Sequence, residues 1–297
     1  SSAYGPFRQR SVRDVVKEIE FQIKDQEVGF IDFEDENLCL NKKWFLTLFS
    51  KIKPLIAGRN IELRAMNGLY PASIDEEIVS LMKTTGFKTL NLSLGSSSID
   101  QLNKFSRNDV RASFENALIL SEKYNLESVS YIIAAAPGQT AKTSIDDLIY
   151  LAQKRTLAGL SIYYPAPGSR DYIKCKEKNI LPKYFSQMRS SALPLNDTTS
   201  RIEAVTLLRL SRILNFIKHL IDTHQGLPDP ESFFPPENDL FSDRQTLSIK
   251  LLQWFLYDGK IRGACPDDRS IYTHIADEGL AQKFIDRIKR VSIKGVK

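Results

Sequence analysis

The sequence predicts an α/β protein, in which a partial (β/α)6-type, TIM-like parallel barrel lacking its first strand precedes a helical C-terminal region. Short apolar stretches of strand character alternate with stretches of helical spacing five times in succession, which indicates parallel strands joined by right-handed crossovers. The predicted strands end in small, polar, Gly- or Pro-bearing segments, which allow close approach of a ligand. After about residue 182 the alternation stops and helical spacing takes over.

The first predicted strand, at residues 28–33, is the stretch around which the other elements are arranged. Glu34, Asp35, Glu36 and Asn37 follow directly at its C-terminal end, where parallel sheets bind ligands. Three neighbouring carboxylates repel one another and need a cation, an ammonium group or open solvent. Taken alone, the stretch is equally consistent with an acidic surface turn.

Capping residues predict where the first helices begin. A Ser, Thr or Asn side chain can accept a hydrogen bond from the backbone two or three residues later. The predicted caps are Ser11 with Asp14, Asn41, Ser73 with Glu76, and Thr143 with Asp146. The pair of Ser73 and Glu76 is the clearest capping box of the chain. Two further helices are predicted around residues 100–105 and 110–124.

The other predicted strands repeat the pattern of the first, with an apolar run followed by small or polar residues. These strands lie at residues 60–66, 89–94, 129–134 and 159–164. Their ends are expected at 66–68, 95–98, 135–140 and 165–168. Because the carboxyl ends of parallel strands meet at one edge, these segments are expected to surround one site.

A domain boundary is predicted where the alternation stops. Residues 1–185 would form the partial barrel, 186–200 a polar linker and 201–297 the helical C-terminal region. Residues 225–241, rich in Pro, Gly and acids, are expected to form a loop. The helices of the last region are predicted at 201–222, 243–257 and 277–291.

Composition excludes some classes of function. The 297 residues are 42% hydrophobic and 26% charged, as in ordinary soluble proteins. No run is long and apolar enough to span a bilayer, so no membrane span is expected and the predicted location is cytoplasmic. A net charge of +5 without a compact Lys/Arg run does not predict a nucleic-acid partner. Cys39, Cys175 and Cys265 lie too far apart in sequence to form a metal-ligand cluster.

Seven short segments occur in an order and spacing that is more specific than any of them alone. They are 8–11 (RQRS), 33–37 (FEDEN), 66–68 (MNG), 92–98 (LSLGSSS), Arg107, 137–140 (PGQT) and 164–168 (YPAPG). In this order the sequence resembles the radical S-adenosylmethionine (radical-SAM) superfamily, particularly the branch whose members often carry an upstream cobalamin-binding domain. The resemblance extends from about residue 4 to residue 182.

The resemblance implies a fold and an activity. Members of the family hold a [4Fe–4S] cluster and S-adenosylmethionine at the C-terminal ends of the strands, and generate a 5′-deoxyadenosyl radical that abstracts hydrogen from a substrate. The implied cofactors are therefore S-adenosylmethionine, the cluster and, in this branch, cobalamin. The implied partners are a small-molecule, lipid or natural-product substrate and a reductant of the flavodoxin or ferredoxin type. The substrate itself is not readable from the sequence, because fold does not determine function.

Carried over by position, the resemblance also implies which residues bind the methionine part of the cofactor. Glu34 and Asp35 fall where the family binds the ammonium group. Arg107 falls where a cation would pair with the methionine carboxylate in charge-assisted geometry, although it could equally be a surface residue near a helix start. Asn67 is either a contact to the ligand or a turn residue at a strand end.

The nucleoside part of the cofactor is assigned in the same way. Ser93 and Ser96 would face the ribose, unless their hydroxyls only make local turns. Ala135 and Pro137 would contact the adenine, and Tyr164 would form the floor of the pocket. No residue of this chain is assigned as a metal ligand.

Three departures from the family pattern leave alternatives open. The CxxxCxxC loop that supplies the cluster thiolates is absent, so its ligands are expected upstream of Ser1. Gly95 stands where an acid is usual, and Gln139 and Ala135 replace a usual Glu and Gly. A binding module that has lost catalysis is one alternative. The other is a barrel lyase or aldolase that uses Glu34, Asp35 and Glu36 around a divalent cation.

Overall fold

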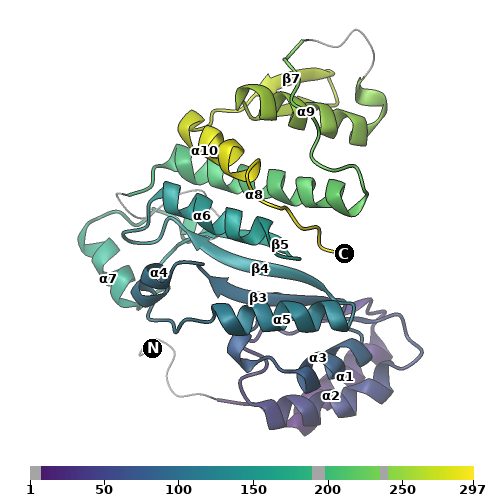
Figure 1. Ribbon diagram of the computed structural model, residues 1–297. Coiled ribbons are helices and arrows are strands. Elements are labelled where there is room, and N and C mark those ends of the chain that lie inside the picture. The colour runs from purple at the N-terminus through teal and green to yellow at the C-terminus, as the bar shows by residue number, and fades with distance from the viewer. Residues whose placement is uncertain (1–7, 189–197, 235–239) are drawn as a thin grey trace.

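The centre of the fold consists of parallel strands that follow one another in chain order (Figure 1). The computed structural model describes residues 8–188, 198–234 and 240–297. Strands β1 and β2 form one sheet and β3, β4 and β5 a second, and single parallel bridges at Leu63–Phe87 and Leu69–Leu92 connect the two. The strands are β1 (Phe30–Asp32), β2 (Glu62–Arg64), β3 (Thr89–Gly95), β4 (Glu127–Ala134) and β5 (Leu157–Ile162).

The helices between these strands confirm the predicted α/β alternation. They are α1 (Val12–Asp25), α2 (Lys42–Ile56), α3 (Glu76–Thr84), α4 (Ile99–Lys104), α5 (Arg111–Lys123), α6 (Ala141–Ala152) and α7 (Arg170–Glu177). Short 3₁₀ turns lie at Pro71–Ser73, Phe185–Met188 and Leu240–Ser242. In the described residues the strands do not close on themselves, so the partial barrel remains a prediction.

Two of the predicted helix caps are confirmed and two are displaced. Ser11 and Asn41 accept hydrogen bonds from the backbone N–H groups three residues later, as expected. The capping box at Ser73 is wrong, because the chain there makes a 3₁₀ turn and Asp75 Oδ1 accepts from Ile78 N at 3.1 Å instead. Thr140, three residues before the predicted cap, begins α6.

The C-terminal region is not purely helical, which corrects the prediction. It contains α8 (Arg201–Asp222), α9 (Arg244–Asp258) and α10 (Glu278–Ile288), but also an antiparallel hairpin of β6 (Arg262–Cys265) and β7 (Ser270–Thr273). A true capping box of Ser200 and Glu203 begins α8. The predicted linker lies largely outside the described residues, since 189–197 are not among them.

Helix α8 attaches the C-terminal region to the outer edge of β5. Its Asn215 side chain accepts from Ala158 N at 2.8 Å and donates to Ala158 O at 3.0 Å, so it satisfies backbone groups of an edge strand. One buried apolar cluster extends through the sheet, the helices α1, α2, α3, α5 and α6, and the C-terminal helices. The division into two domains at about residue 185 stays a prediction.

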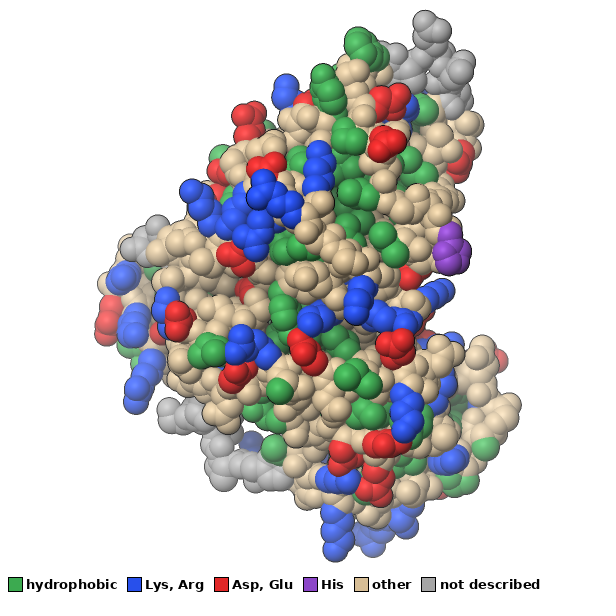
Figure 2. All heavy atoms as spheres, in the orientation of Figure 1, with side chains coloured by type: hydrophobic (Ala, Val, Ile, Leu, Met, Phe, Trp, Pro, Cys, Tyr) green, Lys and Arg blue, Asp and Glu red, His purple; other side chains and the backbone are tan. Residues whose placement is uncertain are grey.

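The surface carries charges of both signs. Figure 2 shows Lys and Arg side chains on several elements of one face, with Asp and Glu side chains close to many of them. Among the described residues, no helix is long and apolar enough to cross a membrane.

Candidate functional site

The ends of β1 and β2 bring Glu34 and Asn67 together. The Asn67 side-chain amide donates to the Glu34 carbonyl at 2.9 Å and to its carboxylate at 3.1 Å. Both Glu34 and Asp35 are exposed directly after β1, so their carboxylates remain available to a cationic group. Asn67 therefore orients an acid at the strand end, and its direct contact with a ligand stays a prediction.

The end of β3 meets Arg107, fourteen residues further along the chain. Arg107 Nη1 donates to Ser93 Oγ at 3.1 Å. A Cβ atom at Gly95 would lie 3.2 Å from the same nitrogen, and Gly95 has a φ of 81°. Burial lowers the pKa of Arg107, and no ion pair with a carboxylate is found for it in the described part of the chain. Because Gly95 has no side chain, the guanidinium group of Arg107 fits beside it. Among the described residues this guanidinium has no carboxylate partner.

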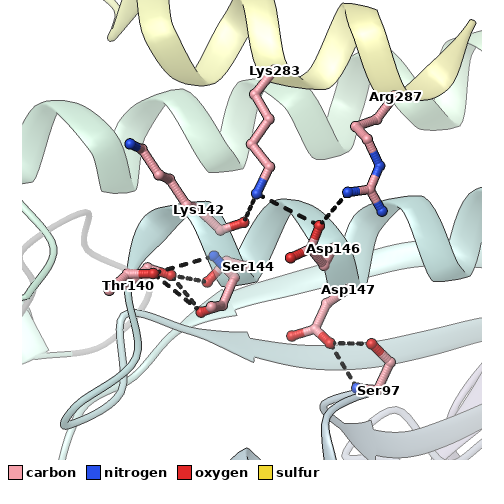
Figure 3. A network of polar contacts seen from close by, with 9 residues as sticks. Ser97, Thr140, Lys142, Ser144, Asp146, Asp147, Lys283 and Arg287 are labelled. Atoms are coloured by element: carbon pink, nitrogen blue, oxygen red, sulfur yellow. Dashed lines mark hydrogen bonds and ion pairs between the residues drawn. The ribbon is translucent and has the colours of Figure 1, made fainter.

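Ser96 has a different environment from Ser93. Its side chain is 1% exposed and donates to both carboxylate oxygens of Asp147 at 3.0 Å, and it accepts from Ser98 N at 3.1 Å. Ser97 donates to Asp147 Oδ1 through both its backbone N and its hydroxyl at 2.6 Å (Figure 3). Asp147 on α6 therefore fixes the backbone of the β3 end. Contact of Ser96 with a ribose stays a prediction and requires this hydroxyl to leave Asp147.

The buried carboxylate of Asp147 was not found by sequence reasoning. It is 2% exposed, and burial raises its pKa to about 6, although the hydrogen bonds from Ser97 and Ser96 oppose the shift. The only sequence signal is an acid among the apolar core residues of α6. Such a signal cannot identify a partner that lies about fifty residues away.

At the end of β4, Gln139 determines the path of the chain. Its side-chain oxygen accepts from Ala136 N and its amide nitrogen donates to Ile133 O, both at 3.1 Å. A glutamate could not make the second bond, because a carboxylate only accepts. Gln139 thereby explains one departure from the family pattern. Ala135, buried with a φ of 58°, lies in this turn, whereas Pro137 is exposed.

At the end of β5, Tyr163 and Tyr164 have different surroundings. Tyr163 donates its hydroxyl to Asp171 at 2.7 Å, and burial together with this bond raises its pKa. Tyr164 is 43% exposed, so its side chain is accessible to a ligand. Its place at the floor of a pocket stays a prediction.

A pocket of about 510 Å³ lies along β1, next to α1 and the start of α2. It includes Glu34 and Asp35 but none of the other predicted site residues.

The structure brings the predicted site residues together as two pairs, Glu34 with Asn67 and Ser93 with Arg107. Among the described residues, no group of three His, Cys, Asp or Glu side chains could hold a metal ion.

Comparison with known proteins addresses the fold. No family model and no curated protein sequence matches the chain. Its fold is similar to that of the radical S-adenosylmethionine methyltransferase TsrM from Kitasatospora setae, in a structure with cobalamin and a [4Fe–4S] cluster bound. The identity is 17% and the TM-score 0.50, over 57% of this chain and 34% of the methyltransferase.

A second structure of TsrM, with tryptophan substrate and the analogue aza-SAM bound, gives 15% identity and a TM-score of 0.45, over 52% of this chain and 30% of the other. The chain thus spans about one third of the length of that enzyme. At 17% identity, the comparison with the first TsrM structure shows similarity of fold alone. In its fold the chain resembles a cobalamin-binding radical-SAM enzyme, as the order of its strand ends predicts.

Proposed function

We propose that the strand ends of this chain bind S-adenosylmethionine as part of a radical-SAM enzyme. The observation that carries the proposal is the half-buried guanidinium of Arg107, held by Ser93 and without a carboxylate partner among the described residues. A cation that has lost part of its hydration is stabilised by an anionic ligand group that accepts its hydrogen bonds. The methionine carboxylate is such a group.

The other charged end of the methionine moiety fits the neighbouring strands. Glu34, oriented by Asn67, and Asp35 offer carboxylates to an ammonium group at the ends of β1 and β2. A zwitterion is thus matched by an acid on one strand end and a cation on another. The nucleoside would extend toward Ser93 for the ribose, and toward Ser96 only if its hydroxyl left Asp147. Ala135, Pro137 and Tyr164 would then surround the adenine.

The described residues do not fit a [4Fe–4S] cluster. Such a cluster needs gathered thiolates, whereas Cys39 lies before α2, Cys175 on α7 and Cys265 on β6. Burial also raises the pKa of the Cys39 thiol, which disfavours the thiolate. We therefore derive no radical step from these residues. The cluster and cobalamin remain proposals, and the residues that hold them would lie outside the described residues. A reductant of the flavodoxin or ferredoxin type is likewise a proposal.

Replacing Arg107 by alanine tests the proposal. We expect wild-type chain to bind S-adenosylmethionine in isothermal titration calorimetry, and R107A to bind it roughly 10- to 100-fold more weakly, because a charge-assisted hydrogen-bonded pair is lost. Arg111 supplies a matched control, since its guanidinium is already paired with Asp109 at 2.8 Å. R111A is expected to bind as the wild type does.

A second variant separates the two ends of the ligand. E34Q keeps the size of the side chain but removes the charge that would face the ammonium group, so we expect weaker binding of S-adenosylmethionine. Unchanged affinity in both R107A and E34Q, or absence of saturable binding to the wild type, would contradict the proposed function.

A further inference from the structure

The inner face of the sheet, opposite the helices, differs in its residue types from the inner face of a closed barrel. On β3 the leucines at 90, 92 and 94 are fully buried toward the helices, so the side chains between them point to the other face. In a closed parallel barrel, bulky branched side chains pack this face. Here it carries Asp32, Asn91, Ser93, Tyr131 and Gly159, of which only Asn91 is buried.

Two glycines determine where the ring of Tyr131 lies. A Cβ atom at Gly159, its neighbour on β5, would lie 2.5 Å from ring atom Cδ1. A Cβ atom at Gly68 would lie 2.9 Å from Cδ2, and Gly68 has a φ of 91° that disfavours other residues. The two edges of the ring thus face positions where no side chain fits. The ring itself is half-buried.

The hydroxyl end of Tyr131 lies in a polar environment. It donates to Asn91 Oδ1 at 3.2 Å. Burial raises the pKa of Tyr131, and the negative charge of the nearby Asp32 raises it further. Asp32 Oδ1 accepts from Met66 N at 3.3 Å, and in the described residues Asp32 makes no ion pair. The nearby Arg64 is paired with Glu62 at 2.9 Å. A partly exposed anion therefore accompanies the ring.

We propose that this inner face is a binding site for a small molecule with a flat ring and an ammonium or N–H donor, the ring stacking on Tyr131 and the donor meeting Asp32. An aromatic surface next to an unpaired carboxylate is complementary to such a ligand in both shape and charge. The site adjoins the proposed cofactor site, because Ser93, which binds Arg107, would lie 3.3 Å from a Cβ at Gly68. Its role as the substrate site rests on the proposed function, whereas its occupancy does not.

Three related compounds test the chemistry of the site in calorimetric titrations with the full 297-residue chain. The probe is 2-phenylethylamine, which has a flat ring and an ammonium group. The control 2-cyclohexylethylamine keeps the charge without the flat ring, and 3-phenylpropionate keeps the ring with the opposite charge. We expect 2-phenylethylamine to bind at least about fivefold more tightly than either control, a ratio typical of one aromatic or charge contact. Equal affinities, or no binding of the probe, would overturn the proposal.

Variants locate the binding. Y131L and D32N are each expected to weaken 2-phenylethylamine about fivefold, whereas Y131F, which keeps the ring, stays within about twofold of the wild type. If Y131L folds poorly, the conservative D32N variant still shows whether 2-phenylethylamine binds at this face. The matched control is Y150L, which removes another half-buried tyrosine, on α6 beside Glu115. Unchanged binding in D32N together with Y131L would place the probe elsewhere and contradict the proposal.

The same variants separate this inference from the proposed function. Y131L is expected to bind S-adenosylmethionine as the wild type does, and R107A to bind 2-phenylethylamine as the wild type does. If only the amine binds as described, the cofactor proposal is wrong and the inner-face site stands. If only S-adenosylmethionine binds, the inner-face proposal is wrong and the cofactor site stands.

Discussion

Replacing Asp147 by asparagine is expected to change how the stability of the protein depends on pH. In the unfolded chain this carboxyl has its ordinary pKa of 3.8, and burial raises the pKa to about 6 in the folded protein. Between these values the folded protein holds a proton that the unfolded chain has released. The free energy of unfolding therefore falls as the pH rises from about 4 to 6, and the loss is complete above the folded pKa.

The D147N variant lacks this titration but keeps an oxygen that can accept from Ser97 N. Relative to D147N, the wild type is expected to lose roughly 2–3 kcal/mol of unfolding free energy between pH 4 and pH 7, measured by urea denaturation. The matched control is D146N, whose half-exposed carboxylate pairs with Lys283 and Arg287 on α10 (Figure 3). It should alter stability by less than about 1 kcal/mol. Parallel pH profiles for the wild type and D147N would contradict the prediction.

Replacing Lys218 by methionine is expected to cause a large loss of stability. The Lys218 side chain is fully buried, and its ammonium group donates to three backbone carbonyls, those of Ala152 at 3.2 Å and of Lys154 and Lys294 at 2.7 Å. Methionine leaves these three acceptors without their donor. We expect a decrease of about 2–4 kcal/mol in the free energy of unfolding at pH 7, measured by urea denaturation.

The pH dependence of this effect has the opposite sign from that of Asp147. Burial lowers the pKa of Lys218 from 10.5 to about 7, so between these values the unfolded chain holds a proton that the folded protein has released. Wild-type stability then rises with pH, and the gap to K218M is expected to widen by about 2 kcal/mol between pH 7 and pH 9. K294M, which removes an exposed side chain but keeps its backbone contacts, serves as the control. A gap that does not widen would show that Lys218 titrates normally.

Lys218 connects three parts of the molecule that are distant in sequence. Lys294 N donates to Ala152 O at 2.9 Å, so one carbonyl of α6 accepts from both α8 and the C-terminal segment. Asp222, at the end of α8, accepts from Val296 N and Lys297 N at 2.9–3.0 Å. Hydrogen exchange at Lys294 would therefore speed up in K218M, as an independent readout of the same contact.

Some elements were readable from the sequence because their causes are local. The apolar runs at 89–94 and 129–134 became β3 and β4, and the stripe of α8 was recognised from its helical spacing. Ser11 and Asn41 cap their helices through atoms three residues away. Ser73 failed as a cap because Asp75 competes for the same helix start. The β6–β7 hairpin was missed, since its four-residue strands contain Arg, Gly and Ser without clear alternation.

The candidate site divides in the same way. The resemblance singled out Glu34, Asn67, Ser93 and Arg107 one by one, and the structure pairs them. It gave no indication of Asp147 or Tyr131, whose partners lie about fifty and forty residues away in sequence.

The sequence by itself therefore determined the alternation of helices with the strands β1 to β5 and the polar character of the strand ends, because periodicity and capping act over a few residues. Only the tertiary structure decided which hydroxyl is available to a ligand, Ser93 beside Arg107, and which is engaged by a buried acid, Ser96 beside Asp147. Burial and hydrogen-bond partners depend on which distant segments pack together, and no local pattern in the sequence encodes that choice.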